Sequence, residues 1–429
     1  MKLINNTKDL LTLLKLDGKS NLPISNFQID SRKVKKNSVF FGLSGSNFDG
    51  SFFAEDAINK GASLAIIRKN KISNSMANSP KIISVKSPEE YLISSAERAI
   101  ERFKGIVIGV TGSNGKTTTK NILNNCIKNS YATYQNYNNE IGLPLCALEL
   151  DSQKSTAIFE MGAAKLGDID LLSKIIKPNI GIITHIGHSH LEGLNSVKGV
   201  LTVKSELINN IKTSGSAIVP DGKYVNYWKK MRNDINFHTF GLKPSASFFP
   251  TQINMTKEGL SFFIESIHLK KRVPIKTKLI GMHNVLNILA SFAAIHAARL
   301  NVEEFTYHLR ALKNSPQRLD LKLWVKQSTV IDDTYNANPD SMKAALDVLC
   351  QFQGRKVAIL GDMKELGRYR KKLHIELGDY AKIHGVDCLI GYGDLMRHAI
   401  FSFGNHGFFF KDKLELVNFL KKYIKGKEN

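Results

Sequence analysis

The sequence contains little cysteine. Its 429 residues include four cysteines, and no two of them form a CxxC pair or the ligand spacing of a zinc site. This scarcity argues against a disulfide-rich framework and against a structural zinc, so we expect reduced thiols that are mostly buried. The four residues are Cys126, Cys146, Cys350 and Cys388.

Long hydrophobic runs are absent as well. No stretch approaches the ~18 consecutive apolar residues of a membrane span. The N-terminal segment MKLINNTKDLLTLLKL is amphipathic and lacks the cleavage pattern of a signal peptide. We therefore expect a cytoplasmic protein without a membrane span.

Acidic residues are outnumbered by basic ones. The chain has 38 Asp and Glu against 60 Lys and Arg, which gives a formal net charge of +22. Such an excess can indicate a nucleic-acid partner. Here the basic residues are mainly lysines spread along the chain, with no Arg-rich helix, RNA-binding aromatic strand or zinc finger beside them. We interpret the charge as a compositional bias and predict no nucleic-acid partner.

A glycine-rich segment is the most informative feature that is present. Residues 109–120 read GVTGSNGKTTTK and follow the apolar run at 106–108. A strand that enters such a turn and then a helix directs backbone N–H groups at one anion. Lys116 adds a charge for the phosphates and the Thr117 hydroxyl can reach Mg²⁺, although Val110 replaces the first glycine of the strict P-loop spacing. We predict an ATP or GTP phosphate site formed by Gly112, Ser113, Asn114, Gly115, Lys116, Thr117 and Thr118.

The chain is predicted to be an α/β protein with three domains. Its length suits about three units of ~150 residues. In the central segment, short apolar strands alternate with amphipathic helices, which predicts a doubly wound, mostly parallel sheet whose site lies at the carboxyl ends of the strands. The expected central strands are 106–110, 157–161, 180–184 and 216–220.

Smaller α/β units are expected on either side of this sheet. We place a substrate-binding domain at 1–84, the central ATPase domain at 85–313 and a Rossmann-like domain at 314–429. Strands at 330–332, 357–360 and 388–390 are expected in the last of these, each followed by a loop and a helix.

Acidic and imidazole side chains follow two of the central strands. Glu160 ends one strand, where a carboxylate commonly holds the Mg²⁺ of a nucleotide. The segment THIGHSHLEGL places His185, His188 and His190 after another strand. A zinc site is conceivable, but the spacing suits no standard zinc motif and no cysteine is near. We favour one histidine as a Mg²⁺ ligand and the others as polar loop residues.

Other polar residues have two possible interpretations. From its position alone, Lys204 reads as a solvated lysine on a helix. Asn284 and Asn287 share one face at the start of an apolar helix and could bind a base edge, although simple capping by Asn284 is the alternative.

Arg318 is a candidate clamp for the γ-phosphate. Residues 332–339 contain several carboxylates and amides within one predicted turn. Pro339 should be the first residue of the helix that follows. The preference of Asn, Asp and Pro for turns explains part of this composition.

Taken together, these segments resemble the Mur ligase family, whose members form amide bonds at the expense of ATP. Further motifs extend the resemblance over most of the chain, including DSRKV, FDG and LGDMKELG. The segments that carry it are TGSNGKTTTK (111–120), NYNNEIGLP (136–144), EMGA (160–163), HLEG (190–193), GMHNVLN (281–287) and DDTYNANPDSM (332–342).

The resemblance also implies a substrate pair. NNEIG, YNANP and LGDMKELG are similar to the family members that add D-alanyl-D-alanine to UDP-N-acetylmuramoyl-tripeptide through an acyl phosphate. It further implies ATP, two Mg²⁺ ions and a monomeric enzyme of peptidoglycan precursor synthesis. The rivals are a diaminopimelate- or lysine-adding ligase, a folylpolyglutamate synthase, and a P-loop NTPase that binds nucleic acid.

Residue roles follow from the same resemblance. Lys116 and Thr117 would bind phosphate and Mg²⁺, with Glu160 on the same ion. His190 and a carbamylated Lys204 would bind a second Mg²⁺, since carbamylation turns the amine into a carboxylate-like ligand. The implied catalytic group is Lys116, Lys204, His190 and Arg318. Asn284 and Asn287 would bind adenine, Arg318 the γ-phosphate and Asp333 the ribose.

The substrate-binding residues complete the set. Asp30, Ser31 and Arg32 would hold the UDP moiety, and Asn138 and Asn139 would lie toward the peptide. The remaining implied contacts are Tyr335, Asn336 and Asn338. The chain departs from the family at Gln317, where relatives usually carry glycine, and at Ser51, where histidine often follows FDG.

Overall fold

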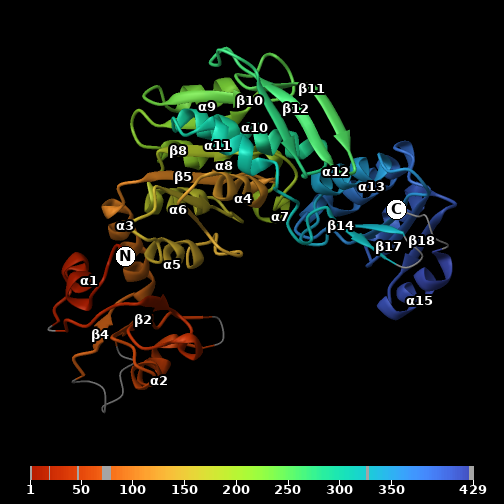
Figure 1. Cartoon of the computed structure of the whole chain (residues 1–429). Helices are drawn as coiled ribbons and strands as arrows, with labels where there is room; N and C mark the ends of the chain where they lie inside the picture. Colours follow the sequence, from red (N-terminus) through yellow and green to blue (C-terminus); the bar gives the residue numbers. More distant parts are fainter. Residues whose placement is uncertain (1, 19, 46–47, 70–78, 325–327, 425–429) are drawn as a thin grey trace.

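The computed structural model describes residues 2–18, 20–45, 48–69, 79–324 and 328–424. Figure 1 shows an N-terminal unit (red) below a large central unit, and a C-terminal unit (blue) at the right of the central unit. The predicted three-part α/β fold class is confirmed. Within these described ranges, no helix is long and apolar enough to cross a membrane.

The N-terminal unit is built on a four-stranded parallel sheet in the order β1-β2-β3-β4. The apolar run at β2 is buried throughout, because this strand lies inside the sheet. A helix begins after Asn6, whose side chain accepts the N–H of Asp9. The elements are α1 (Thr7–Leu14), β1 (Asn26–Gln28), β2 (Ser38–Phe41), α2 (Ala54–Asn59), β3 (Leu64–Arg68) and β4 (Ile82–Val85).

The central unit contains a six-stranded sheet, all of it parallel, in the order β10-β9-β8-β5-β7-β6. β6 and β7 lie on one side of β5 and β8, β9 and β10 on the other, so the strand order switches at β5 and the loops after β5, β7 and β8 meet at one edge. The strands are β5 (Ile106–Thr111), β6 (Ser130–Ala132), β7 (Thr156–Glu160), β8 (Ile180–Ile183), β9 (Ser216–Pro220) and β10 (Asn236–Phe240).

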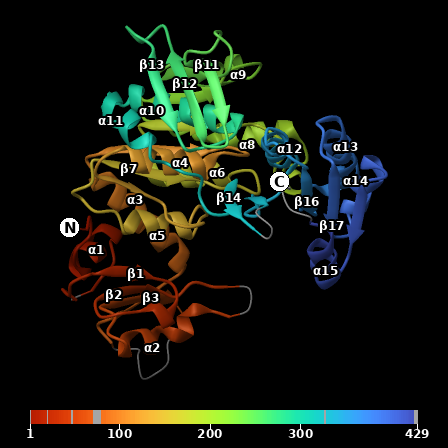
Figure 2. The same ribbon diagram turned by 45° about the vertical axis from the view of Figure 1, so that its right-hand side comes forward.

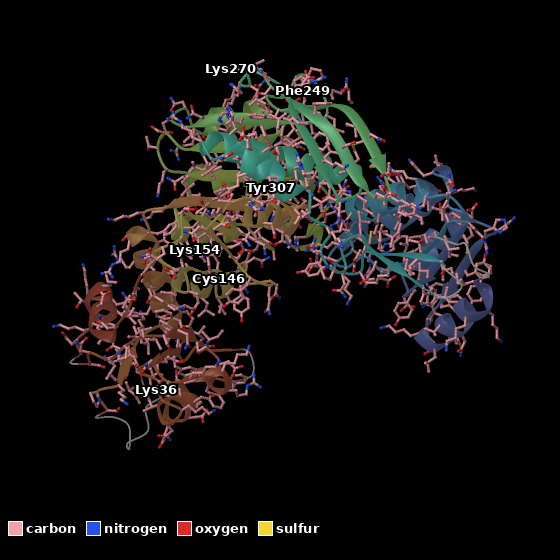
Figure 3. All side chains as sticks on the ribbon, in the orientation of Figure 1. Lys36, Cys146, Lys154, Phe249, Lys270 and Tyr307 are labelled. Carbon is pink, nitrogen blue, oxygen red and sulfur yellow. The ribbon has the colours of Figure 1, made fainter. Side chains whose placement is uncertain are left out.

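Helices cover both faces of this sheet, as the nearly continuous apolar strands require. Ile108 and Val110 of β5 pack against α4 and α10, whereas Val107 packs on the opposite face against other helices. Figure 3 labels Cys146, on α5, at the side of the central unit that faces the N-terminal unit. The helices are α3 (Pro88–Arg102), α4 (Lys116–Cys126), α5 (Gly142–Leu148), α6 (Asp168–Ile176), α7 (Leu191–Leu194), α8 (Val197–Asn209), α9 (Val225–Met231), α10 (Met282–Ala297) and α11 (Val302–Leu309).

An antiparallel sheet of three strands, β11 (Phe249–Thr256), β12 (Gly259–Glu265) and β13 (Val273–Thr277), was not among the sequence predictions. Figure 2 shows it above α10. Alternate residues of β12, Leu260, Phe262 and Ile264, are buried in the core that α10 shares. This period-two alternation is the signal that could have revealed the strand.

The C-terminal unit holds a parallel sheet in the order β16-β17-β18, flanked by helices. Figure 2 places α12 on the side toward the central unit. As predicted, α12 begins at Pro339, and Asn338 caps it reciprocally with Ser341. The elements are α12 (Pro339–Cys350), β16 (Val357–Gly361), α13 (Arg370–Ile383), β17 (Cys388–Tyr392), α14 (Met396–Phe403), β18 (Gly407–Phe410) and α15 (Lys413–Tyr423).

The strand expected at 330–332 is present, but it stands apart from the other two strands expected in this unit. In the described residues, β15 (Thr329–Asp332) pairs antiparallel with β14 (Asp320–Leu323) rather than joining the β16 sheet. The preceding segment supplies a complementary strand, and Lys322 Nζ lies 2.5 Å from Asp332 Oδ2 across the pair. β15 therefore pairs with its neighbour in the chain across an antiparallel, hairpin-like contact.

Candidate active site

The phosphate loop lies between β5 and α4, at the switch point of the central sheet. Gly112 has φ +146° and Gly115 has φ +81°, values that residues with a β-carbon rarely adopt. A Cβ at Gly112 would also clash with the Thr184 hydroxyl, and one at Gly115 with the Asn287 side chain. Lys116 Nζ donates to the Gly112 carbonyl across 2.8 Å. The two glycines thus let the loop pass close to its neighbours as it enters the N-terminus of α4, where the backbone N–H groups of a helix favour an anion.

A polar cavity of ≈ 450 Å³ opens beside this loop. It is lined by the central unit on one side and by residues beyond 313 on the other. The structure therefore brings together side chains that are more than 200 positions apart in the chain. The predicted residues that line it are Ser113, Asn114, Gly115, Lys116, Thr117, Asn138, Asn139, Glu160, His190, Arg318, Asp333, Tyr335, Asn336 and Asn338.

Glu160 reaches this cavity because β7 pairs with β5 in a register that sets it opposite Val110. Its side chain is buried, and Asn138 Nδ2 donates to Glu160 Oε1 across 3.0 Å. Lys120 Nζ lies 3.9 Å from Oε2, and this oxygen accepts no hydrogen bond from the described part of the chain. A buried carboxylate oxygen without a hydrogen-bond donor suits a cation ligand. Asn138 contacts the carboxylate directly, and the Asn139 side chain instead accepts the N–H of Gly142.

The three histidines after β8 have three different surroundings. His185 lines a second cavity, which shares Asn114 and Gly115 with the polar cavity, and burial lowers the pKa of this histidine. Asp340 accepts the N–H of His188, with its other oxygen 3.2 Å from Nδ1. His190 lines the polar cavity. Among residues the structure describes, no three His, Cys, Asp or Glu side chains are grouped as a metal would need, so the histidines do not form one zinc ligand set.

Lys204 is buried, contrary to the interpretation from its position alone. The side chain, on α8, has no exposed surface, and its Nζ makes no hydrogen bond to any residue that the structure describes. Burial, together with the charge of Lys116, holds the pKa of Lys204 well below its usual value. The solvated-lysine interpretation is therefore wrong, because α8 packs this face against the sheet. A buried amine that favours its neutral form is a nucleophile rather than a surface cation.

Asn284 and Asn287 form a buried amide pair at the start of α10. Asn284 Nδ2 donates to the Ile280 carbonyl across 2.7 Å, and Asn287 Nδ2 donates to Asn284 Oδ1 across 3.0 Å. The N-cap of α10 is Gly281, so capping by Asn284 is wrong. Both asparagines line the cavity of ≈ 240 Å³ that His185 also lines. Thr118 lines the same cavity.

Arg318 and Asp333 approach the phosphate loop from the C-terminal side. Arg318 Nη2 donates to Thr117 Oγ1 across 3.1 Å, and its guanidinium lies 4.0 Å from the Tyr335 ring centroid. Asp333 accepts the Leu319 N–H, while burial raises the pKa of Asp333 to about 6. Gln317 has φ +60°, in the left-handed region that favours glycine, so the departure from glycine expected at this position places a residue with a β-carbon in a strained conformation.

The loop at 332–339 docks directly on the phosphate loop. Asn114 and Asn338 exchange two amide hydrogen bonds, of 3.2 Å and 2.6 Å. Tyr335 and Asn336 are exposed at the mouth of the polar cavity. This turn therefore does more than reverse the chain, because it presents side chains of the C-terminal unit to the nucleotide site.

The candidate UDP residues lie elsewhere. Asp30 lines a separate cavity of ≈ 550 Å³ between the N-terminal and central units. Its pKa is lowered by the hydrogen bond from Arg32, whose side chain is exposed, whereas Ser31 is buried. The structure does not bring these three residues to the polar cavity. The same space holds three tyrosines that the sequence analysis missed, Tyr131, Tyr134 and Tyr137.

A phosphate loop at the switch point of a doubly wound sheet, faced by a second α/β unit, is the architecture of an enzyme that uses a nucleoside triphosphate. Comparison with protein-family models gives three matches. They are "Mur ligase family, catalytic domain" over residues 23–101, "Mur ligase middle domain" over 110–295, and "Mur ligase, glutamate ligase domain" over 317–425. The chain belongs to the Mur ligase family, as its motifs implied.

Individual relatives agree with this assignment. The UDP-N-acetylmuramoyl-tripeptide–D-alanyl-D-alanine ligase of Buchnera aphidicola subsp. Baizongia pistaciae is 32% identical over 435 residues, covering 100% of this chain and 93% of that protein. A crystal structure of MurF from Acinetobacter baumannii matches with TM-score 0.89 and 27% identity over 99% of this chain and 94% of the other. The structure of MurF ligase from Thermotoga maritima in complex with ADP matches with TM-score 0.82 and 27% identity. The match covers 94% of this chain and 92% of the other.

Proposed function

We propose that this protein is an ATP-dependent ligase that joins D-alanyl-D-alanine to the terminal carboxylate of UDP-N-acetylmuramoyl-tripeptide. The observation that carries the proposal is the polar cavity, where Lys116, Glu160 and Arg318 meet from three separate segments. The named relatives act on this substrate pair, and one structural neighbour holds ADP. ATP is therefore the nucleotide that we assign to the phosphate loop.

The proposed reaction has two steps. The tripeptide carboxylate attacks the γ-phosphorus of ATP, its oxygen forming a bond as the bond to ADP breaks, which gives an acyl phosphate. The amine of D-alanyl-D-alanine then attacks the acyl carbon, loses a proton and expels phosphate, leaving the amide. Lys116 and Arg318 would neutralise the transferring phosphoryl group, so the protein contributes mainly positioning and electrostatic stabilisation.

Magnesium fits the residues present at the cavity. Glu160 Oε2 is buried without a hydrogen-bond donor, and Thr117 and His190 line the same space. We assign Thr117 and Glu160 to one Mg²⁺, and His190 to a second. Mg²⁺ usually takes few protein ligands, and water and phosphate oxygens complete its coordination shell. The small number of protein ligands at each of these two sites is compatible with that preference. When bound, the ions would neutralise phosphate charge.

Lys204 is proposed to carry a carbamate. Its neutral amine would attack carbon dioxide, forming an N–C bond and releasing one proton, which yields an anionic oxygen ligand. The burial of Lys204 and its lowered pKa support this chemistry, since only the neutral amine reacts. Lys204 also lies near enough to His190 for its charge to lower the pKa of that histidine, as neighbouring ligands of one ion would require.

The three units are proposed to divide the substrates among them. Residues 1–84 would hold the UDP moiety through Asp30, Ser31 and Arg32. Residues 85–313 would bind ATP, and 314–429 would complete the ATP site. Asn284 and Asn287 would bind adenine and Asp333 the ribose, whereas Asn138, Asn139, Tyr335, Asn336 and Asn338 would face the peptide substrates. The enzyme is proposed to act as a monomer in the cytoplasm.

Product formation tests this function. The purified enzyme would be incubated with ATP, Mg²⁺ and UDP-N-acetylmuramoyl-tripeptide, and phosphate release and product mass would be followed for each amine. We expect an amide product with D-alanyl-D-alanine and none with single amino acids. Product from UDP-N-acetylmuramoyl-dipeptide with diaminopimelate or lysine would instead favour a rival ligase. An ATPase that needs only an oligonucleotide would favour the nucleic-acid alternative.

A further inference from the structure

The candidate metal ligand His190 is held by a carboxylate of the C-terminal unit. His190 Nδ1 lies 2.5 Å from Glu365 Oε2, and the N–H of Glu192 donates to the Glu365 carbonyl across 2.9 Å. Glu365 lies in the loop after β16, within the segment LGDMKELG. The segment contributed to the family resemblance, but none of its residues was assigned a role. One residue of the C-terminal unit therefore contacts the histidine loop through both its side chain and its backbone.

The backbone on both sides of this contact is specialised. His190 has φ +51° and Glu365 has φ +58°, both in the left-handed region that residues with a β-carbon rarely adopt. Such a conformation persists only where surrounding contacts enforce it. Here Met363 and Leu366, on either side of Glu365, are buried. A Cβ at Gly367 would come within 3.2 Å of Glu192 Cα, so the two loops approach each other closely.

We propose that Glu365 is a positioning residue for His190. By accepting the Nδ1 proton, its carboxylate selects the tautomer in which Nε2 has the free lone pair, and it fixes the orientation of the ring. Nε2 is then the atom available to a divalent cation in the polar cavity. The inference rests on the proposed function, because that function requires His190 to bind Mg²⁺.

This arrangement connects the position of the C-terminal unit to the metal site. His190 belongs to the central unit and Glu365 to the C-terminal unit, so the hydrogen bond exists only while the two units are docked. The neighbouring contact of Asp340 with His188 lies at the same junction. Docking of the C-terminal unit on the central unit therefore places Arg318 beside the phosphate loop. The same docking orients His190 for a metal ion.

The tautomer of His190 tests the proposal without turnover. Long-range ¹H–¹⁵N spectra of the ¹⁵N-histidine-labelled, metal-free enzyme distinguish Nδ1–H from Nε2–H, and a His190→Gln sample identifies the signal. We expect Nδ1–H in the wild type and in Glu365→Gln, whose amide oxygen can still accept the proton. Glu365→Ala should lose this preference. Glu376→Ala removes another partly exposed carboxylate, on α13, and should change nothing.

The Mg²⁺ dependence of ligation supplies the second measurement. We expect Glu365→Ala to raise the Mg²⁺ concentration for half-maximal rate about tenfold while kcat at saturating Mg²⁺ changes little, as for other residues that orient a metal ligand. Glu365→Gln should restore most of the loss. An unchanged His190 tautomer in Glu365→Ala, or an unchanged Mg²⁺ dependence, would overturn the proposal. A wild-type enzyme that forms no amide would refute the proposed function separately, because the spectra need no substrate.

Discussion

Arg318 donates a hydrogen bond to the hydroxyl of Thr117 across 3.1 Å, although 201 positions separate the two residues in the chain. Thr117 stands in the first turn of α4, at the phosphate loop, and Arg318 comes just before β14. The Tyr335 ring packs against the guanidinium at 4.0 Å. The arginine is thus oriented toward the phosphates by contacts on two sides, which makes its geometry as important as its charge.

Replacing Arg318 with lysine should therefore impair catalysis while keeping the charge. A lysine lacks the planar fork and its stacking on Tyr335, so we expect kcat to fall by about 10- to 100-fold with little change in thermal stability. Phosphate release at saturating ATP measures the effect. Arg310→Lys, at an exposed position, is the matched control. Wild-type kcat in Arg318→Lys would contradict a role as phosphate clamp.

Removing the phosphate-loop lysine should have a larger effect. Lys116→Ala deletes the charge expected to stabilise the transferring phosphoryl group, so kcat should fall by about 10²- to 10³-fold. Calorimetric titration with ADP should also show weaker binding. Lys128→Ala, which removes an exposed lysine just beyond the end of α4, should leave both quantities unchanged. Equal ADP affinity in Lys116→Ala and wild type would argue against this phosphate site.

Lys204→Ala should abolish ligation in a way that small carboxylates can reverse. If a carbamate supplies an oxygen ligand, added acetate or propionate can occupy the space of the missing side chain and restore part of the activity. Exposed Lys198, on the same helix, provides the control variant Lys198→Ala. ¹³C NMR after incubation of the wild type with ¹³C-bicarbonate should show a carbamate signal that Lys204→Ala lacks. Full activity of Lys204→Ala without added carboxylate would refute the assignment.

Asp333 should make stability depend on pH. Burial raises its pKa to about 6 in the folded protein, above the ordinary value near 4. The folded state therefore binds this proton more tightly, and its stabilising contribution, complete below about pH 4, is lost as the pH rises through about 6. Asp333→Asn, which keeps an acceptor for Leu319, should be more stable than the wild type above pH 7 by about 1 kcal/mol, a value reduced for partial exposure.

Thermal unfolding at pH 5 and pH 8 measures this difference. The increase in the free energy of unfolding of Asp333→Asn over the wild type should be clear at pH 8 and smaller at pH 5. Asp394→Asn, at an exposed aspartate, should show no such pH dependence. Identical differences at the two pH values would mean that Asp333 has an ordinary pKa in the folded protein.

The locally encoded parts of the site were predictable from sequence. Gly112 and Gly115 have the positive φ values that the strand–turn–helix order predicts, and the close approach of Thr184 and Asn287 is a second reason for glycine that only the structure shows. The start of α12 at Pro339 likewise follows from residues adjacent in sequence. Glu160 reaches the cavity because parallel strands bring their carboxyl ends to one edge, a rule that needs no knowledge of the particular packing.

The amino-acid sequence by itself therefore determined the phosphate loop, the α/β fold class and the family. Only the tertiary structure decided that Lys204 is buried, that His190 rather than His185 or His188 lines the polar cavity, and that β15 pairs with β14. It also decided that Glu365 contacts His190. Burial and side-chain partners depend on surfaces that distant segments bring together, and those contacts leave no fixed spacing in the chain.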